Sequence, residues 1–186
     1  MKKIISLFAA GLLSLGAFAQ EVIMPSQPSR GITNLEELDR GYWLAAEATC
    51  MPTLMHDMTN FVQAGISLVN GYRFNEFFKA GVGVGLVYMT NVKNVNDGKP
   101  KLYVPLFLEL RGDILSSKIY KAVPYWNVDF GYQFGNGLMA NVGPGLRVGE
   151  KRNAFTVSAG YAFLQVPLPA DVANYSGVFV RVGYEF

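Results

Sequence analysis

Cysteine is almost absent from the chain: Cys50 is the only one in 186 residues, which excludes an internal disulfide framework. An excess of charge of one sign is missing as well. Without residues 1–19, which we expect to be removed, 14 basic residues stand against 14 acidic ones, so the charge gives no indication of nucleic-acid binding. Helical stripes of apolar residues are also lacking. Apolar residues instead alternate with glycine, polar and charged residues, which is typical of β-strands.

Residues 1–19 have the pattern of a secretory signal peptide. Lys2 and Lys3 precede an apolar run over 4–18, and Ala17-Phe18-Ala19 forms a small-residue cleavage site before Gln20. The apolar run is too short for a transmembrane helix. We therefore expect export and removal of this segment.

Residues 20–40 differ in composition from the rest of the chain. They contain Pro25, Pro28 and an acidic patch over 34–39, and they show no sustained alternation. Proline-containing polar stretches of this kind are typical of linkers. We predict a periplasmic lead-in that precedes the folded domain.

The C-terminal nine residues show the alternation most clearly. One face of the predicted strand is apolar and ends in two aromatic residues, and the other carries two charges. Shifting the register by one residue would place Arg181 and Glu185 in lipid, at a cost of about 2 to 4 kcal/mol for an arginine near the midplane. The apolar face comprises Val178, Val180, Val182, Tyr184 and Phe186, and the other comprises Phe179, Arg181, Gly183 and Glu185.

Seven similar segments precede this one. A single strand cannot lie in lipid with unpaired backbone groups, and an even number of strands returns both termini to one side of the membrane. Residues 41–186 are therefore predicted to form an all-β domain, an eight-stranded antiparallel up-and-down transmembrane β-barrel. The predicted strands cover 42–50, 62–74, 78–88, 102–111, 125–134, 138–149, 155–163 and 178–186.

Several local features follow from the same alternation. Trp43 is expected inside the barrel and Trp126 on its outer surface. Pro144 interrupts the sixth segment without a backbone donor, which favours a β-bulge. Residues 166–175 contain two prolines and are predicted to form a long outer loop, as are 51–60 and 90–100.

Charged residues of both signs fall on the inward positions. Opposite charges in a narrow, side-chain-filled lumen are expected to pair, because a buried unpaired ion costs several kcal/mol. The sequence thus predicts a plugged lumen; a narrow or gated conduit that forms when the pairs rearrange is the alternative. The predicted lumen charge network comprises Glu47, Arg73, Lys79, Glu109, Arg111, Asp129, Arg147, Arg181 and Glu185.

No catalytic, cofactor-binding or metal-binding set can be grouped from the sequence. His56 stands beside Asp57 and between Met55 and Met58, a combination that would suit a soft metal or a hydrolase, but further partners at a recognisable spacing are missing. The glycine-rich run over 81–85 lacks the spacing of a phosphate-binding loop. Cys50 is expected to pack as a small apolar side chain near the outer leaflet.

The signal peptide, the eight alternating segments and the terminal Tyr184-Glu185-Phe186 together resemble small outer-membrane β-barrels of the OmpA/OmpX type over residues 41–186. The resemblance implies insertion into outer-membrane lipid of a Gram-negative cell. It also implies that Phe186 is the assembly signal read by the barrel-assembly machinery. Members of this group include structural anchors, adhesins, host-interaction proteins and a few lipid-modifying enzymes, so the resemblance does not select an activity.

The first functional hypothesis is a non-enzymatic surface or envelope scaffold that acts through its extracellular loops on an external ligand or surface partner. The alternatives are a narrow or gated porin-like channel for small solutes and a lipid-modifying enzyme that uses His56. A secreted soluble barrel of the lipocalin kind is a further alternative, and it would place the apolar residues inside and the charged ones outside.

Overall fold

The computed structural model describes residues 40–52, 62–90, 101–117, 119–150, 153–167 and 172–186. The predicted signal peptide, nearly all of the lead-in and His56 lie outside these residues. No helix among the described residues is long and apolar enough to cross a membrane.

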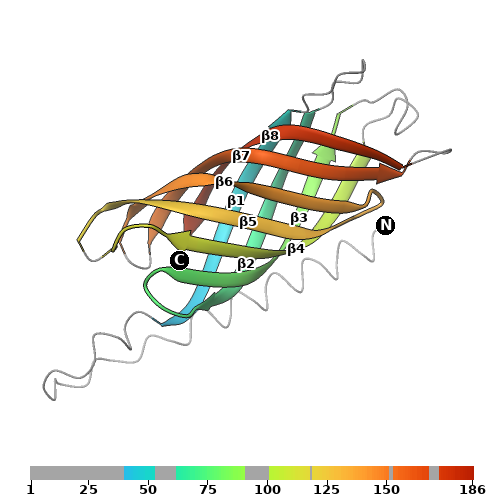
Figure 1. Ribbon diagram of the computed structural model, residues 1–186. Coiled ribbons are helices and arrows are strands. Elements are labelled where there is room, and N and C mark those ends of the chain that lie inside the picture. The colour runs from blue at the N-terminus through green and yellow to red at the C-terminus, as the bar shows by residue number, and fades with distance from the viewer. Residues whose placement is uncertain (1–39, 53–61, 91–100, 118, 151–152, 168–171) are drawn as a thin grey trace, which may run out of the picture. The chain divides into compact units, whose positions relative to one another are not determined.

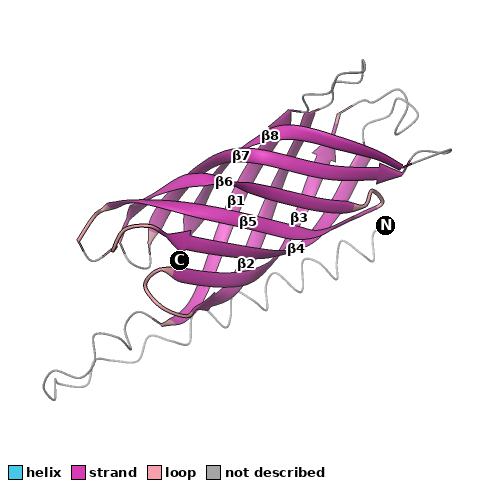
Figure 2. Cartoon of the chain, in the orientation of Figure 1, coloured by secondary structure: helices cyan, strands magenta, loops and turns pink. Residues whose placement is uncertain are grey.

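The described residues form eight antiparallel strands that close into a barrel in sequence order (Figure 1). This confirms the predicted fold class. Almost all of the described chain is strand, with short turns between (Figure 2). The strands are β1 (Gly41–Pro52), β2 (Val62–Arg73), β3 (Phe78–Met89), β4 (Lys101–Asp113), β5 (Ala122–Phe134), β6 (Leu138–Gly149), β7 (Ala154–Pro167) and β8 (Val172–Glu185).

The barrel has two distinguishable ends. The end where β1 begins and β8 finishes is called here the terminal end, and the opposite end is called the loop end. The tight turn between β2 and β3 lies at the terminal end, where the side-chain oxygen of Asn75 accepts hydrogen bonds from the backbone nitrogens of Phe77 and Phe78 at 2.9 and 2.8 Å. Such an Asx turn explains why asparagine suits this position.

The first and last strands meet along a shorter ladder than the other neighbours do. β1 and β8 pair over six positions, from Ala45↔Glu185 to Cys50↔Val180. β7 and β8 pair over fourteen, from Ala154↔Glu185 to Pro167↔Val172. This β1–β8 seam completes the ring, so each strand has a partner on both sides.

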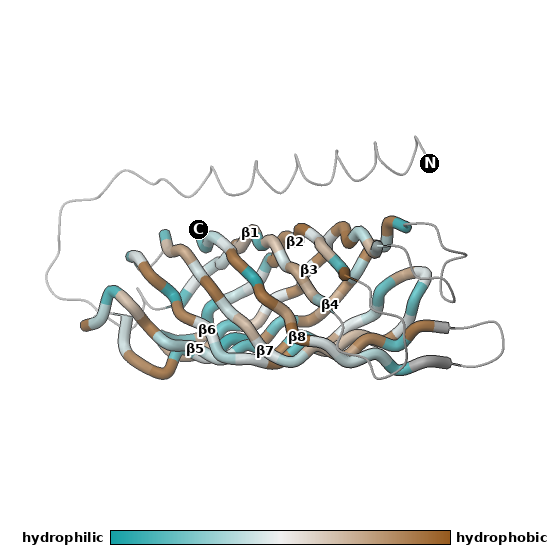
Figure 3. Tube along the Cα trace, turned by 90° about the horizontal axis from the view of Figure 1, so that it is seen from above, coloured by the Kyte–Doolittle hydropathy of each residue, from teal (hydrophilic) through white to brown (hydrophobic). Residues whose placement is uncertain are grey.

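Side chains alternate between the two faces of the wall, as the period of two requires. Along β5, Tyr125, Asn127 and Asp129 are buried, whereas Trp126 and Phe130 are 40% and 58% exposed. Trp43 is buried inside, so both predicted tryptophan orientations are confirmed. Hydrophilic and hydrophobic residues accordingly alternate along the chain trace (Figure 3). The barrel thus has a polar interior and an apolar exterior.

Inward glycines make room for bulky side chains on neighbouring strands. A side chain at Gly83 of β3 would overlap the ring of Phe107, its partner on β4. A Cβ atom at Gly145 of β6 would likewise overlap the ring of Tyr125 on β5. The pairing of glycine with an aromatic ring fills the narrow interior without forcing the strands apart.

Two local predictions are wrong. Pro144 does not produce a bulge: it pairs with Trp126 on β5, and on the other side Gly145↔Ser158 continues the register of Val142↔Tyr161. The predicted loop over 166–175 is also largely strand, because β7 continues to Pro167 and β8 begins at Val172. Proline at a strand end is compatible with pairing, and the long β7–β8 ladder extends over this stretch.

Candidate functional site: the ionic lumen

All nine residues of the predicted lumen charge network are buried, and none is more than 9% exposed. Each occupies an inward position of its strand, because the strands keep one register from end to end. Seven of the eight strands contribute, so the network is assembled from distant parts of the sequence. They are Glu47 on β1, Arg73 on β2, Lys79 on β3, Glu109 and Arg111 on β4, Asp129 on β5, Arg147 on β6, and Arg181 and Glu185 on β8.

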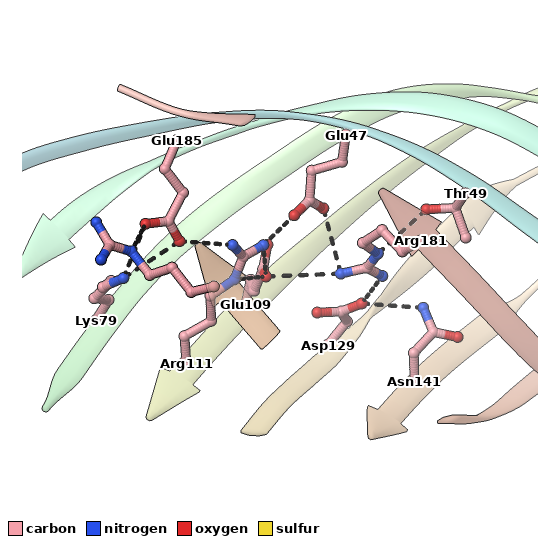
Figure 4. A network of polar contacts seen from close by, with 10 residues as sticks. Glu47, Thr49, Lys79, Glu109, Arg111, Asp129, Asn141, Arg181 and Glu185 are labelled. Atoms are coloured by element: carbon pink, nitrogen blue, oxygen red, sulfur yellow. Dashed lines mark hydrogen bonds and ion pairs between the residues drawn. The ribbon is translucent and has the colours of Figure 1, made fainter. Parts of the chain in front are cut away.

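Glu185 is the acceptor at the centre of the terminal half. Its Oε2 accepts hydrogen bonds from Lys79 Nζ at 3.0 Å and from Arg147 Nε at 2.8 Å. Its Oε1 accepts one from Arg111 Nη1 at 2.9 Å, and Arg73 Nη2 lies 4.0 Å from Oε2. One carboxylate therefore faces four cations from four other strands. Figure 4 shows Lys79 and Arg111 beside it.

Arg181 is the corresponding cation nearer the loop end. It forms an ion pair with Asp129 through Nη2, and its Nη1 lies 3.3 Å from Glu47 Oε2 and 3.6 Å from Glu109 Oε1. Its Nε donates to Thr49 Oγ1 at 3.2 Å. The three carboxylates around Arg181 reverse the arrangement at Glu185, where one acid faces several bases.

Arg111 connects the two halves of the network. It contacts Glu185 at the terminal end and is ion-paired with Glu47 through Nη2. Its Nε donates to Glu109 Oε1 at 2.6 Å. The network is therefore continuous along the lumen from Glu185 to Asp129 (Figure 4).

Aromatic rings occupy space beside these charges. The guanidinium carbon of Arg111 lies 5.1 Å from the ring centroid of Trp43 and 5.4 Å from that of Tyr125. The guanidinium carbon of Arg181 likewise lies 5.2 Å from the ring centroid of Phe179. Cation–π contacts of this kind stabilise a desolvated guanidinium further.

Two polar residues outside the predicted charge network also contact it. Asp113 is 6% exposed, and its Oδ2 lies 3.6 Å from Lys79 Nζ. Asn141 donates to Asp129 Oδ2 at 3.1 Å. Asp113 could have been found by extending the alternation of β4 two residues past Arg111. It brings the described lumen charges to five acids and five bases, so the interior is formally neutral.

Apolar side chains gather toward the loop end of the lumen, and the sequence analysis did not group them. They are contributed by five strands and lie together as one buried cluster. This apolar cluster comprises Met51, Met89, Tyr103, Ala162, Leu164, Val166, Tyr175 and Phe179. The interior thus contains ion pairs toward one end and a hydrophobic cluster toward the other.

The arrangement suits structure better than reaction chemistry. Buried ion pairs hold one another in place, and removing one partner leaves a costly unpaired charge. Among the described residues, no three histidine, cysteine or acidic side chains are grouped as metal ligands. His56, the residue considered for a metal or a hydrolase, lies outside the described residues.

Fold and lumen together define a class: a closed eight-stranded antiparallel barrel with charged side chains inside and apolar ones outside. Among solved structures, the chain is similar to the N-terminal β-barrel domain of OprF from Pseudomonas aeruginosa, at 15% identity and a TM-score of 0.45, covering 77% of this chain and 97% of that one. It is also similar to the outer membrane protein OprG from Pseudomonas aeruginosa, at 11% identity and a TM-score of 0.43, covering 80% and 97%. No family model and no curated protein matches the chain.

Proposed function

We propose that the protein is an integral outer-membrane barrel with a plugged lumen, and that it acts as a non-enzymatic scaffold of the cell surface or envelope through its outer loops. The observation that carries this proposal is the distribution of side chains across the wall: ion pairs inside and apolar groups outside. In water this arrangement would expose the apolar exterior to solvent and bury the charges, which is the reverse of a soluble lipocalin-like barrel.

The outer surface has the features of a membrane-spanning band. At the terminal end, the ring centroids of Phe74 and Phe78 lie 5.8 Å apart, and those of Phe78 and Trp126 lie 6.4 Å apart. At the loop end, Tyr132 and Phe134 form an edge-to-face pair at 5.6 Å. Two aromatic zones that flank an aliphatic band are expected at the two interfaces of a bilayer.

The separation of these zones fits a bilayer. Trp126 and Phe134 lie eight residues apart on one strand, about 27 Å at about 3.4 Å per residue. With a strand tilt of about 40°, this length spans about 20 Å along the membrane normal, close to the apolar band of about 25 Å known for such barrels. The strands are therefore long enough to cross.

The filled lumen supports the scaffold over an open pore. The ionic network and the apolar cluster lie in series, so a solute that crossed the barrel would have to displace both. An eight-stranded barrel leaves an interior that side chains alone can fill. The surface outside the barrel, at the loop end, is then where we place contacts with an external ligand or partner.

A narrow or gated channel is the second candidate. A cavity in the loop-end half, lined in part by Arg181 and Asn141, favours it, because a pore would need such space. Opening would require the ion pairs of Arg111 and Arg181 to be exchanged for others.

Two measurements on the purified full chain test the proposal. In gel electrophoresis without boiling, the folded barrel should migrate differently from the boiled protein, and identical mobility would contradict a detergent-resistant barrel. In planar bilayers, the plugged barrel should show no reproducible conductance steps. Steps of constant size would favour the channel.

A further inference from the structure

A cavity of about 60 Å³ lies inside the loop-end half of the lumen. Its lining includes Arg181 toward the ionic network and Met51, Leu164 and Phe179 from the apolar cluster. One water molecule needs roughly 10 to 15 Å³ measured in this way, so the cavity has room for a small ion with a few waters.

Two side chains that line this cavity carry amide donors without a partner. Gln63 on β2 and Gln133 on β5 both line it, and they are 7% and 2% exposed. Among the described residues, neither amide Nε2 has a hydrogen-bond partner. A buried donor without a partner is unfavourable, so these two groups indicate that an acceptor belongs between them.

Arg181 adds a third donor. Its Nη1 makes no hydrogen bond within the described residues, although it lies 3.3 Å from Glu47 and 3.6 Å from Glu109. Those two carboxylates and Asp129 do not line the cavity. The only charged group among the residues that line the cavity is therefore the guanidinium of Arg181.

The other polar residues that line the cavity are compatible with a bound anion. Thr49, Ser67 and Asn141 line the cavity, and each carries a hydroxyl or amide that can donate. No acidic side chain is part of the lining, which disfavours a metal cation.

We propose that this cavity, defined by Gln63, Gln133 and Arg181, binds a small monovalent anion such as chloride. The anion would accept hydrogen bonds from the two amide Nε2 atoms and from Nη1 of Arg181. The proposal concerns the interior of the barrel and is independent of the role of the loops or the location of the protein.

The direct test uses bromide as the probe, because bromide replaces chloride and scatters anomalously. Crystals of the full chain soaked in sodium bromide should show an anomalous peak within hydrogen-bonding distance of the Gln63 and Gln133 amides. The peak should disappear in Gln63→Leu and in Gln133→Leu. A lumen that shows no peak, or a peak that persists in both variants, overturns the proposal.

A second test works in detergent solution. The thermal unfolding midpoint should rise by about 4 °C in sodium chloride at about ten times the dissociation constant, relative to sodium gluconate of equal ionic strength, whose anion is too large to enter. Gln133→Leu should remove this difference. The matched control is Gln165→Leu, at an outward position of β7, which should keep it. An equal midpoint in both salts, or a difference that survives in Gln133→Leu, contradicts the proposal.

Discussion

The two ends of the lumen are lined by different chemistry. The terminal half is held by Glu185 and its cations, and the loop end by the apolar cluster around Met89 and Leu164. Ion pairs require each partner at a set position, since a missing partner leaves a buried charge. Apolar packing tolerates substitution if volume is conserved. We therefore expect the terminal half to be the more sensitive of the two to single changes.

The largest effect is expected at Glu185. Glu185→Leu leaves Lys79, Arg111 and Arg147 without their shared acceptor, so the free energy of unfolding should fall by about 4 kcal/mol. Urea titration of the detergent-folded protein, followed by the loss of the fast-migrating band, measures it. Glu150→Leu, at an exposed site, is the control and should change stability by less than about 0.5 kcal/mol. Equal effects of the two changes would show that the ionic half does not stabilise the fold.

The apolar end is tested at Leu164, which is 1% exposed. Leu164→Ala should lower the free energy of unfolding by about 3 kcal/mol, because it leaves a cavity. Leu164→Met keeps the volume and should cost less than about 1.5 kcal/mol. The same urea titration compares them. If both variants lose as much as Glu185→Leu, the contrast between the two ends is wrong.

A smaller effect is expected between the two ends, where Gly83 faces the ring of Phe107. Gly83→Ala should cost about 2 kcal/mol, because the new methyl group overlaps the ring. In the double variant with Phe107→Leu, part of this loss should be recovered. A double-mutant cycle on the unfolding free energies measures the coupling, and strict additivity would argue against the contact.

The smallest change in stability is expected at the C-terminal residue. Phe186 is 54% exposed and packs edge-to-face against Tyr184 with ring centroids 4.8 Å apart, so Phe186→Ala should cost only about 1 kcal/mol. If Phe186 is the assembly signal, the amount of folded barrel in cell envelopes should fall several-fold all the same. Phe155→Ala removes a comparable surface ring and should leave assembly unchanged. Equal yields for the two variants would argue against a signal at Phe186.

The alternation of residues carries most of the fold. It identified all eight strands and which side of the wall each side chain occupies, because a buried ionic face and an apolar face cannot be exchanged without a large cost. The alternation could not identify which charged side chains pair with one another. That Glu185 meets Arg147 and Lys79 depends on strand register and tilt, which alternation leaves undetermined.

The wrong and missing predictions also arise because a single segment does not show how its neighbouring strands pair with it. Pro144 looked disruptive in one strand, but its neighbours on β5 and β7 hold the register across it. Asp113 was left out of the charge network because it stands at the very end of its strand, past the last residue assigned to a face, and the apolar cluster was missed because its members are inward residues near predicted loops. Sequence patterns near strand ends are weaker, since pairing with a long neighbour decides where a strand stops.

The position of Glu185 matters for how the ring is joined. The six-pair seam begins at Ala45↔Glu185, so the shortest ladder of the barrel starts at the residue with the most ionic partners. Peeling β8 away from β1 at this end would carry a carboxylate out of the reach of cations on β2, β3, β4 and β6. A pulling experiment on the C-terminus should therefore meet its greatest resistance at the first step, where these ionic contacts break together with the first pairs of the seam and of the β7–β8 ladder.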